Sequence, residues 1–426
     1  MRSFAIVTFI VLLSGASAIG SKVRFEDKII DPSIHTVQLF PNLGRLNDQL
    51  LPAIISIDQE RSLQLSFDQF SEQVQTYSVK IIHCNKDWTS SDLLEMEYLK
   101  DFMNEHVITQ YHLSLNTRTH YVHYVTTIPA VKLPGNYVIK VFRNHNLKDV
   151  VLTKKFMVYA HKVMVKGNVN FSTGVLERFT HQQLDFTIDY SSYPFIFVPH
   201  EELSVVLRQN FRWDNAITNL KPLFIEPGQK KLSYNYFNLE NNFSGGNEFR
   251  VFDLRRIRTS GINVGNIVIK PTSIDVFMAE EKSRHDVPYL FQFDEDGRFM
   301  VFNNEIGGNF TDPEYVHVHF DLKINEMPKS EIYLLGGFND FVEDKKYLLK
   351  YNKDSKSYKL NLWLKQGYYN YIYGVKTGKY KMDHTLLEGS HFQTQNRYDI
   401  IVYHRPPGGR ADLIIGYFVI NHNSTH

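Results

Sequence analysis

Hydrophobic and polar residues alternate with a period of two along much of this chain. The alternation runs through residues 63–68, 184–190, 316–322 and 358–365, and only Trp363 breaks the last of these. Successive side chains of a strand point to opposite faces, so each segment predicts a strand with one face on a core and the other in water. Denser apolar runs, which predict strands covered on both faces, occupy residues 138–142, 156–159 and 413–420.

Helical patterns are scarce. Asp92 followed by Glu95 opens residues 93–103, where apolar residues recur at mixed spacing, and this predicts at most one short helix. Closely spaced strands punctuated by Gly, Pro and Asn are typical of antiparallel sandwiches. The pattern therefore predicts a mostly β protein built from tandem antiparallel β-sandwich (immunoglobulin-like) domains.

The length of 426 residues predicts more than one domain, because a typical domain has roughly 100–200 residues. A closing strand near residues 154–159 predicts an N-terminal β-sandwich domain over residues 19–160. The sequence further predicts a second β-sandwich domain over 161–278, a polar connector over 279–309 and a C-terminal immunoglobulin-like module over 310–426.

Residues 1–18 have the features of a cleavable signal peptide. Arg2 gives a positive start, residues 5–13 form an apolar run, and Ala16 and Ala18 flank a small-residue cleavage site. The run is shorter than the roughly 20 residues that span a bilayer. The sequence therefore predicts export from the cytoplasm, and no later apolar stretch predicts direct membrane insertion.

Composition narrows the class of protein. There are 47 Lys and Arg residues against 46 Asp and Glu, so the net charge of +1 argues against a nucleic-acid-binding protein. Hydrophobic residues make up 43%, which is enough to form folded cores. The single Cys excludes an intrachain disulfide and a Cys-rich metal site.

The sequence contains none of the short motifs of serine hydrolases, zinc proteases or nucleotide-binding proteins. We therefore assign no catalytic, metal-binding or cofactor-binding residues, expect no cofactor and predict a non-enzymatic protein. A hydrolase with a carboxylate pair remains a third alternative, because Asp and Glu are numerous.

Two histidine-containing segments are candidates for chemical sites. His83 beside Cys84 offers a catalytic pair, but neighbouring strand residues point to opposite faces, which favours a structural role. His317 and His319 share one strand face and form half of a metal site. No third ligand is fixed by the sequence, so an exposed strand face is the favoured interpretation.

Two polar segments that also hold aromatic residues are candidates for a partner interface, since Trp and Arg dominate binding hot spots. The alternative is a scaffold role, in which the polar groups satisfy turns and local ion pairs. The candidate interface residues are Asn210, Arg212, Trp213, Asp214, Asn247, Glu248 and Arg250.

An ordered set of segments resembles the type IX secretion system plug protein family of Bacteroidota, formerly a domain of unknown function. These segments are residues 65–68, 83–88, 115–117, 121–124, 135–137, 209–216, 246–253, 364–371, 388–391 and 403–405. The resemblance implies a soluble periplasmic protein that binds the periplasmic mouth of the large outer-membrane translocon barrel and seals it when idle. It implies no catalytic residues and no small-molecule ligand, and it does not indicate which surface contacts the barrel.

Residues 331–341 and 364–373 also resemble the immunoglobulin-like starch- or glycogen-binding module. Such modules place Trp residues on a sugar-binding face. Here Phe341 stands where a Trp often lies, and Trp363 belongs to a different strand, which favours a scaffold use of the fold. The alternative function is therefore a periplasmic carbohydrate-binding β-sandwich protein.

Overall fold

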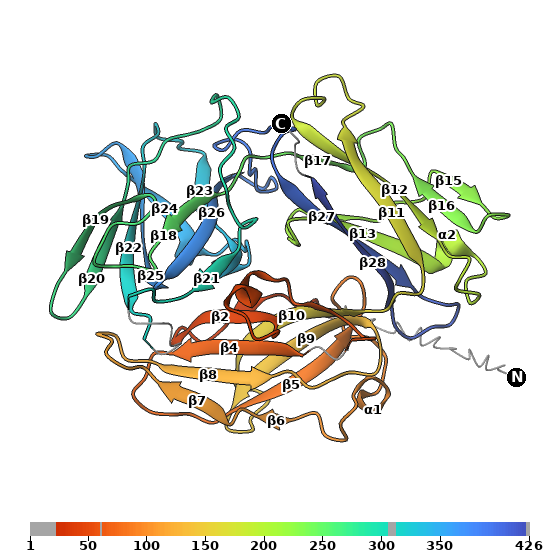
Figure 1. Cartoon of the computed structure of the whole chain (residues 1–426), viewed down its shortest axis with the longest axis horizontal. Helices are drawn as coiled ribbons and strands as arrows, with labels where there is room; N and C mark the ends of the chain where they lie inside the picture. The colour runs from red at the N-terminus through yellow and green to blue at the C-terminus, as the bar shows by residue number, and fades with distance from the viewer. Residues whose placement is uncertain (1–22, 60–61, 306–311, 423–426) are drawn as a thin grey trace, which may run out of the picture.

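The computed structural model describes residues 23–59, 62–305 and 312–422. The predicted signal peptide lies outside these residues. The chain is mostly β and forms several antiparallel sheets, which Figure 1 shows as three groups arranged around a centre. Two strand pairings within the described ranges are parallel, β3 with β10 and β20 with β22.

The first sheet group contains the strands up to β10, arranged in two sheets that face one core. One sheet has the order β1-β10-β9-β5-β6 with β3 beside β10, and the other has the order β2-β4-β8-β7. The elements are β1 Lys28–Ile29, β2 Ile34–Pro41, η1 Leu46–Leu50, β3 Ile54–Ser56, β4 Leu63–Gln69, β5 Tyr77–Cys84, α1 Glu95–Tyr98, β6 His106–Val107, β7 Gln110–Leu113, β8 Val122–Thr127, β9 Gly135–Arg143 and β10 Val150–Tyr159.

Alternation along β4 correctly predicts which side chains enter this core, since Leu63, Leu65 and Phe67 are all buried there. The other face differs from the prediction. Ser66 and Asp68 were expected in water, yet both are buried. The third sheet group covers this face, through a contact described below.

The second sheet group combines an early and a late part of the chain. Its sheets have the orders β11-β12-β16-β15, with β17 beside β12, and β14-β13-β27-β28. Its elements are β11 Met164–Phe171, β12 His181–Asp189, α2 Pro199–Glu202, β13 Leu203–Gln209, β14 Ile217–Thr218, β15 Phe224–Glu226, β16 Lys231–Tyr234, β17 Asn242–Ser244, β27 Asn396–His404 and β28 Leu413–His422.

The third sheet group is one sheet of nine strands in the described ranges, in the order β18-β26-β23-β24-β25-β22-β20-β19 with β21 beside β26. Strands from both ends of this order contribute to one core, so the sheet curves around it and is nearly closed, like a barrel. Its elements are β18 Arg250–Asp253, β19 Val264–Ile269, β20 Ile274–Met278, β21 Phe299–Val301, β22 Tyr315–Leu322, β23 Ser330–Leu335, η2 Gly337–Asn339, η3 Lys345–Tyr347, β24 Leu348–Asn352, β25 Ser357–Lys365 and β26 Gly367–Thr377.

The strand pairing does not follow the predicted boundaries of the second domain (161–278) and the C-terminal module (310–426). Strands β18 to β20 join the third sheet, whereas β27 and β28 return to the second group, where β27 pairs with β13. The third group is thus inserted within the second. The physical reason is that a strand's partner is chosen by long-range packing, which local alternation does not encode. The division into domains and the immunoglobulin-like topology stay predictions.

Candidate functional site

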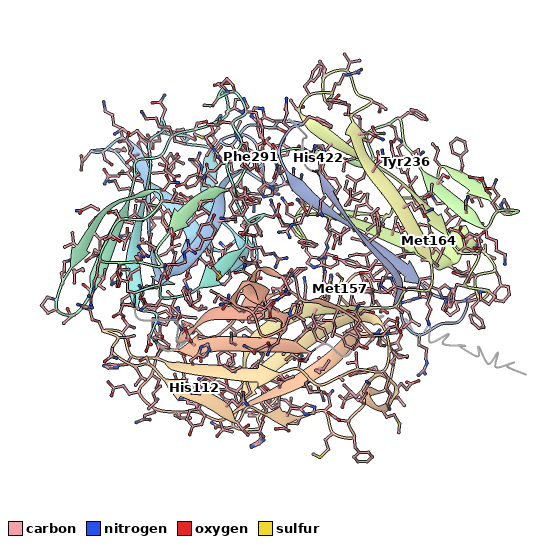
Figure 2. The ribbon with its side chains drawn as sticks, viewed as in Figure 1. His112, Met157, Met164, Tyr236, Phe291 and His422 are labelled. Carbon is pink, nitrogen blue, oxygen red and sulfur yellow. The ribbon has the colours of Figure 1, made fainter. Side chains whose placement is uncertain are left out.

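An apolar core joins the first and second sheet groups. Met157 on β10 packs there with Ile401 on β27 and Ile414 on β28, and Figure 2 shows Met157 where β10 approaches β28. Trp88 is buried in the same core, and its ring meets that of Trp213 edge-on at 4.9 Å between centroids. The two groups therefore share a continuous hydrophobic contact.

Polar side chains reinforce this contact. Tyr403 donates to the side-chain oxygen of Asn136 at 3.0 Å, and Arg405 donates to that of Asn85 at 2.6 Å. The backbone N–H of Lys86 donates to Asp412 at 2.9 Å. Directional bonds of this kind fix the orientation of one group relative to the other.

A buried network joins the first group to the third. The carboxylate of Asp68 accepts hydrogen bonds from His123, Lys365 and Tyr315, each at 2.6 Å. Burial alone would raise the pKa of Asp68, but Lys365 and His123 outweigh it and hold the pKa below its ordinary value. Asp68 is thus a buried carboxylate that is fully satisfied by donors from two sheet groups.

The second and third groups are also tied by ion pairs. Arg397 on β27 pairs with Asp296, which lies ahead of β21. The three groups are therefore held to one another in every combination.

The first predicted interface segment lies at the centre of this assembly. Arg212 is buried, pairs with Asp214 at 2.6 Å, and places its guanidinium 4.1 Å from the centroid of the Phe341 ring. Asn210 is buried too, and its amide donates to Asn396 at 2.7 Å. Trp213 is half-buried, with the guanidinium of Arg208 4.5 Å from its centroid.

The second predicted segment is mostly buried between β17, β18 and the loop before β27. Arg250 donates to both carboxylate oxygens of Glu388 at 3.0 Å and to Glu281 at 3.1 Å. Burial raises the pKa of Glu388, but the charges of Arg250 and Arg284 bring it below its ordinary value. Asn247 is half-buried and donates to the backbone of Glu388 at 2.9 Å.

Glu248 completes that segment. It accepts hydrogen bonds from the hydroxyl of Tyr289 and, at 3.1 Å, from the backbone of Gln395. Burial raises its pKa. The buried members of the predicted interface, Asn210, Arg212, Glu248 and Arg250, thus bond within the chain and link its sheets. Their role in a partner interface stays a prediction.

A cavity of about 670 Å³ opens where the three groups meet. The first segment lines it, together with Trp88, Lys154 and Lys155 from the first group and Arg298 and Phe341 from the third. We define this space as the central cavity. Its volume lies in the range of small-molecule binding pockets, roughly 300–1,000 Å³.

Two of these lining residues, Lys155 and Arg298, were not singled out by the sequence analysis. An isolated Lys or Arg, whether in a strand like Lys155 or just ahead of one like Arg298, carries no signal of its own, because most such residues are solvated. Their position follows only from the meeting of three distant segments.

The side chains of His83, Cys84 and His319 make contacts that fit a structural role. The Cys84 thiol is buried, which raises its pKa to about 12, and His83 is buried with Nδ1 3.0 Å from the Ser91 hydroxyl. His319 contacts Asp275 and Asn361, each at 2.8 Å. In the described part of the chain, no cluster of three or more His, Cys, Asp or Glu side chains could hold a metal ion.

The two aromatic candidates for sugar binding do not form one face. Phe341 is buried beneath the guanidinium of Arg212 in the central cavity. Trp363 is 37% exposed on β25, where its ring packs on His317 with 3.9 Å between centroids. The rings lie in different environments, which removes the basis for a shared carbohydrate platform.

No helix among the described residues has the length and apolar character to cross a bilayer.

Comparison with known proteins identifies relatives of this chain. Residues 34–160 match the type 9 secretion system plug protein first domain. A crystal structure of a hypothetical protein from Parabacteroides merdae ATCC 43184 is similar over 94% of this chain and 100% of that one, with 30% identity and a TM-score of 0.88. Among proteins of curated function, none matches. The full-length match shows that all three sheet groups are shared, and through residues 34–160 the chain belongs to the type 9 secretion system plug protein family.

Proposed function

We propose that this protein is a non-enzymatic plug in the periplasm, which binds the periplasmic mouth of the type IX translocon barrel and seals it when no cargo occupies it. The observation that carries the proposal is the match of residues 34–160 to the first domain of the plug proteins. The proposal includes no cofactor and no catalytic step.

The shape of the molecule supports this role. Outer-membrane barrels reach 36 strands and enclose wide aqueous lumens. A domain of ~100 residues has a radius of gyration near 13 Å, so a single one would leave a wide opening partly uncovered. Three sheet groups arranged around a centre present a broader body (Figure 1).

The contacts between the groups support it as well. A stopper must resist deformation, and flexibly linked domains would open gaps. Here the Asp68 network, the Met157 core and the pair of Arg397 with Asp296 lock the groups to one another. Buried, satisfied polar contacts of this kind favour one fixed arrangement.

The test is capture of the translocon. The exported protein, carrying an affinity tag, is used to pull down partners from an outer-membrane extract in mild detergent, with an extract lacking the barrel as the control. We expect the barrel to be recovered only from the first extract. Failure to recover it from native extract would contradict the proposal.

Deletion of the gene tests the sealing step separately. We expect secretion to continue while the outer membrane becomes permeable to large solutes, measured by uptake of an otherwise excluded dye or antibiotic. Unchanged permeability in the deletion strain would contradict sealing, even if the barrel is captured.

A further inference from the structure

The central cavity has an excess of basic side chains. Nine Lys and Arg residues line it against five Asp and Glu residues. Arg208 is neutralised by Asp399, which lies outside the lining. Arg212, Lys154 and Lys376 pair with Asp214, Asp340 and Glu343, which do belong to the lining.

Within the described ranges, five lining cations form no such pair, of which Arg24, Lys379 and Lys381 are exposed and Arg298 and Lys155 are half-buried. Among the described residues, neither Arg298 nor Lys155 forms an ion pair within 4.0 Å. Burial lowers the pKa of Arg298 to about 10, and the neighbouring charges of Arg397 and Arg208 act in the same direction. Burial also lowers the pKa of Lys155. The carboxylates of Asp296 and Asp27 attract Arg298 and Lys155, respectively, only from beyond ion-pair distance. A half-buried cation without a close counterion favours an incoming negative charge.

Aromatic rings lie beside these cations. The guanidinium of Arg298 lies 5.3 Å from the centroid of Phe211, and the ammonium of Lys155 lies 4.9 Å from that of Trp88. The half-buried ring of Trp213 adds a further apolar surface to the lining. The cavity therefore offers apolar and cationic surface side by side.

Unusual backbone conformations also occur in the lining of the central cavity. Two pairs of consecutive non-glycine residues with positive φ line the cavity, Asn210 with Phe211 and Asp340 with Phe341, and φ lies between 54° and 60° in all four. Left-handed conformations are costly for such residues and cluster where a site must be shaped.

We propose that the central cavity binds an acidic peptide segment whose carboxylates pair with Arg298 and Lys155 and whose apolar side chains pack on Phe211 and Trp213. The two half-buried cations without a close ion pair belong to different sheet groups, so one small anion would neutralise one of them, whereas a chain with several carboxylates reaches both. Lys379 and Lys381, exposed on the loop after β26, extend the basic lining outward. This proposal goes beyond the plug function and can fail while that function stands.

The test is isothermal titration of the purified exported chain with three probes. They are a capped hexapeptide of alternating glutamate and phenylalanine, the same peptide with glutamine in place of glutamate, and inorganic phosphate. We expect the glutamate peptide to bind at least about tenfold more tightly than the glutamine peptide, and more weakly as salt rises. Equal binding of the two peptides, binding of phosphate as tight as that of the glutamate peptide, or no binding would overturn the proposal.

Arg298→Met separates binding from folding. Because Arg298 forms no close ion pair in the free protein, we expect the variant to melt at the same temperature as the wild type or higher, and to bind the glutamate peptide at least about tenfold more weakly. Lys350→Met, at an exposed position on β24, is the matched control and should bind like the wild type. A lower melting temperature for Arg298→Met, or unchanged peptide affinity, would contradict the assignment.

Discussion

Substitution of Asp68 by Asn is the sharpest test of how the first and third sheet groups are joined. The change keeps the size of the side chain and removes its charge. The ammonium of Lys365, 1% exposed and 2.6 Å from the carboxylate, then stays buried without its counterion. The asparagine amide would also direct hydrogens at donors, since His123 and Tyr315 both contact the carboxylate.

Removing one partner of a buried ion pair typically destabilises a protein by about 3–5 kcal/mol. At ~1.4 kcal/mol for each tenfold change, the ratio of unfolded to folded protein should rise by roughly two to three and a half powers of ten. Tyr315→Phe removes a single hydroxyl from the same site and should cost only about 1 kcal/mol. The loss of stability should therefore be clearly larger for Asp68→Asn than for Tyr315→Phe.

Urea denaturation at neutral pH, followed by circular dichroism, measures the loss. Asp68→Asn combined with Lys365→Met should be more stable than Asp68→Asn alone, because the buried charge is removed with its partner. A loss below about 1 kcal/mol for Asp68→Asn would refute the reasoning, as it would show that the network adds nothing to stability.

Three further substitutions or reactions test other parts of the structure. The pKa of Glu248 is raised in the folded protein, so its contribution to stability is complete below the pKa that it has in the unfolded chain and is lost as pH rises through its folded pKa. In thermal melts, the stability of Glu248→Gln relative to the wild type should therefore be greater at pH 8 than at pH 4. The opposite trend would refute this reasoning. Trp213→Ala loses its contact with Trp88 and should lower stability by about 2–3 kcal/mol while translocon capture persists; lost capture at unchanged stability would instead make Trp213 a partner contact. The Cys84 thiol, with its pKa raised to about 12, should react with a thiol reagent only as fast as the protein unfolds, and rapid labelling of the native protein would contradict its burial.

The sequence predicts the strands well because alternation is a local signal. Residues 184–190 and 316–322 coincide closely with β12 and β22, and the expected short helix is the four-residue α1. The sequence does not predict which strands pair with one another. Nothing local indicates that β13 pairs with β27 rather than with a neighbour, so the predicted boundaries and the sheets diverge.

For the candidate site, too, some features follow from the sequence and others do not. Asn210, Arg212, Trp213 and Asp214 were singled out from their composition, and all four line the central cavity. Burial of Arg212 could not be read from the sequence, because its surroundings come from the third group and include Phe341. Composition identifies which residues are unusual, whereas their exposure depends on segments far away in the chain.

The insertion of the third sheet group within the second has a consequence for biogenesis. As the chain emerges vectorially, β13 must wait through the synthesis of nearly two hundred residues before β27 arrives to complete its sheet, since the pairing joins Gln209 with Tyr398. Contacts so distant along the chain form slowly. Until then the apolar face of β12 is an attractive target for molecular chaperones, and a premature stop codon ahead of β27 would release a product whose middle portion is prone to proteolysis.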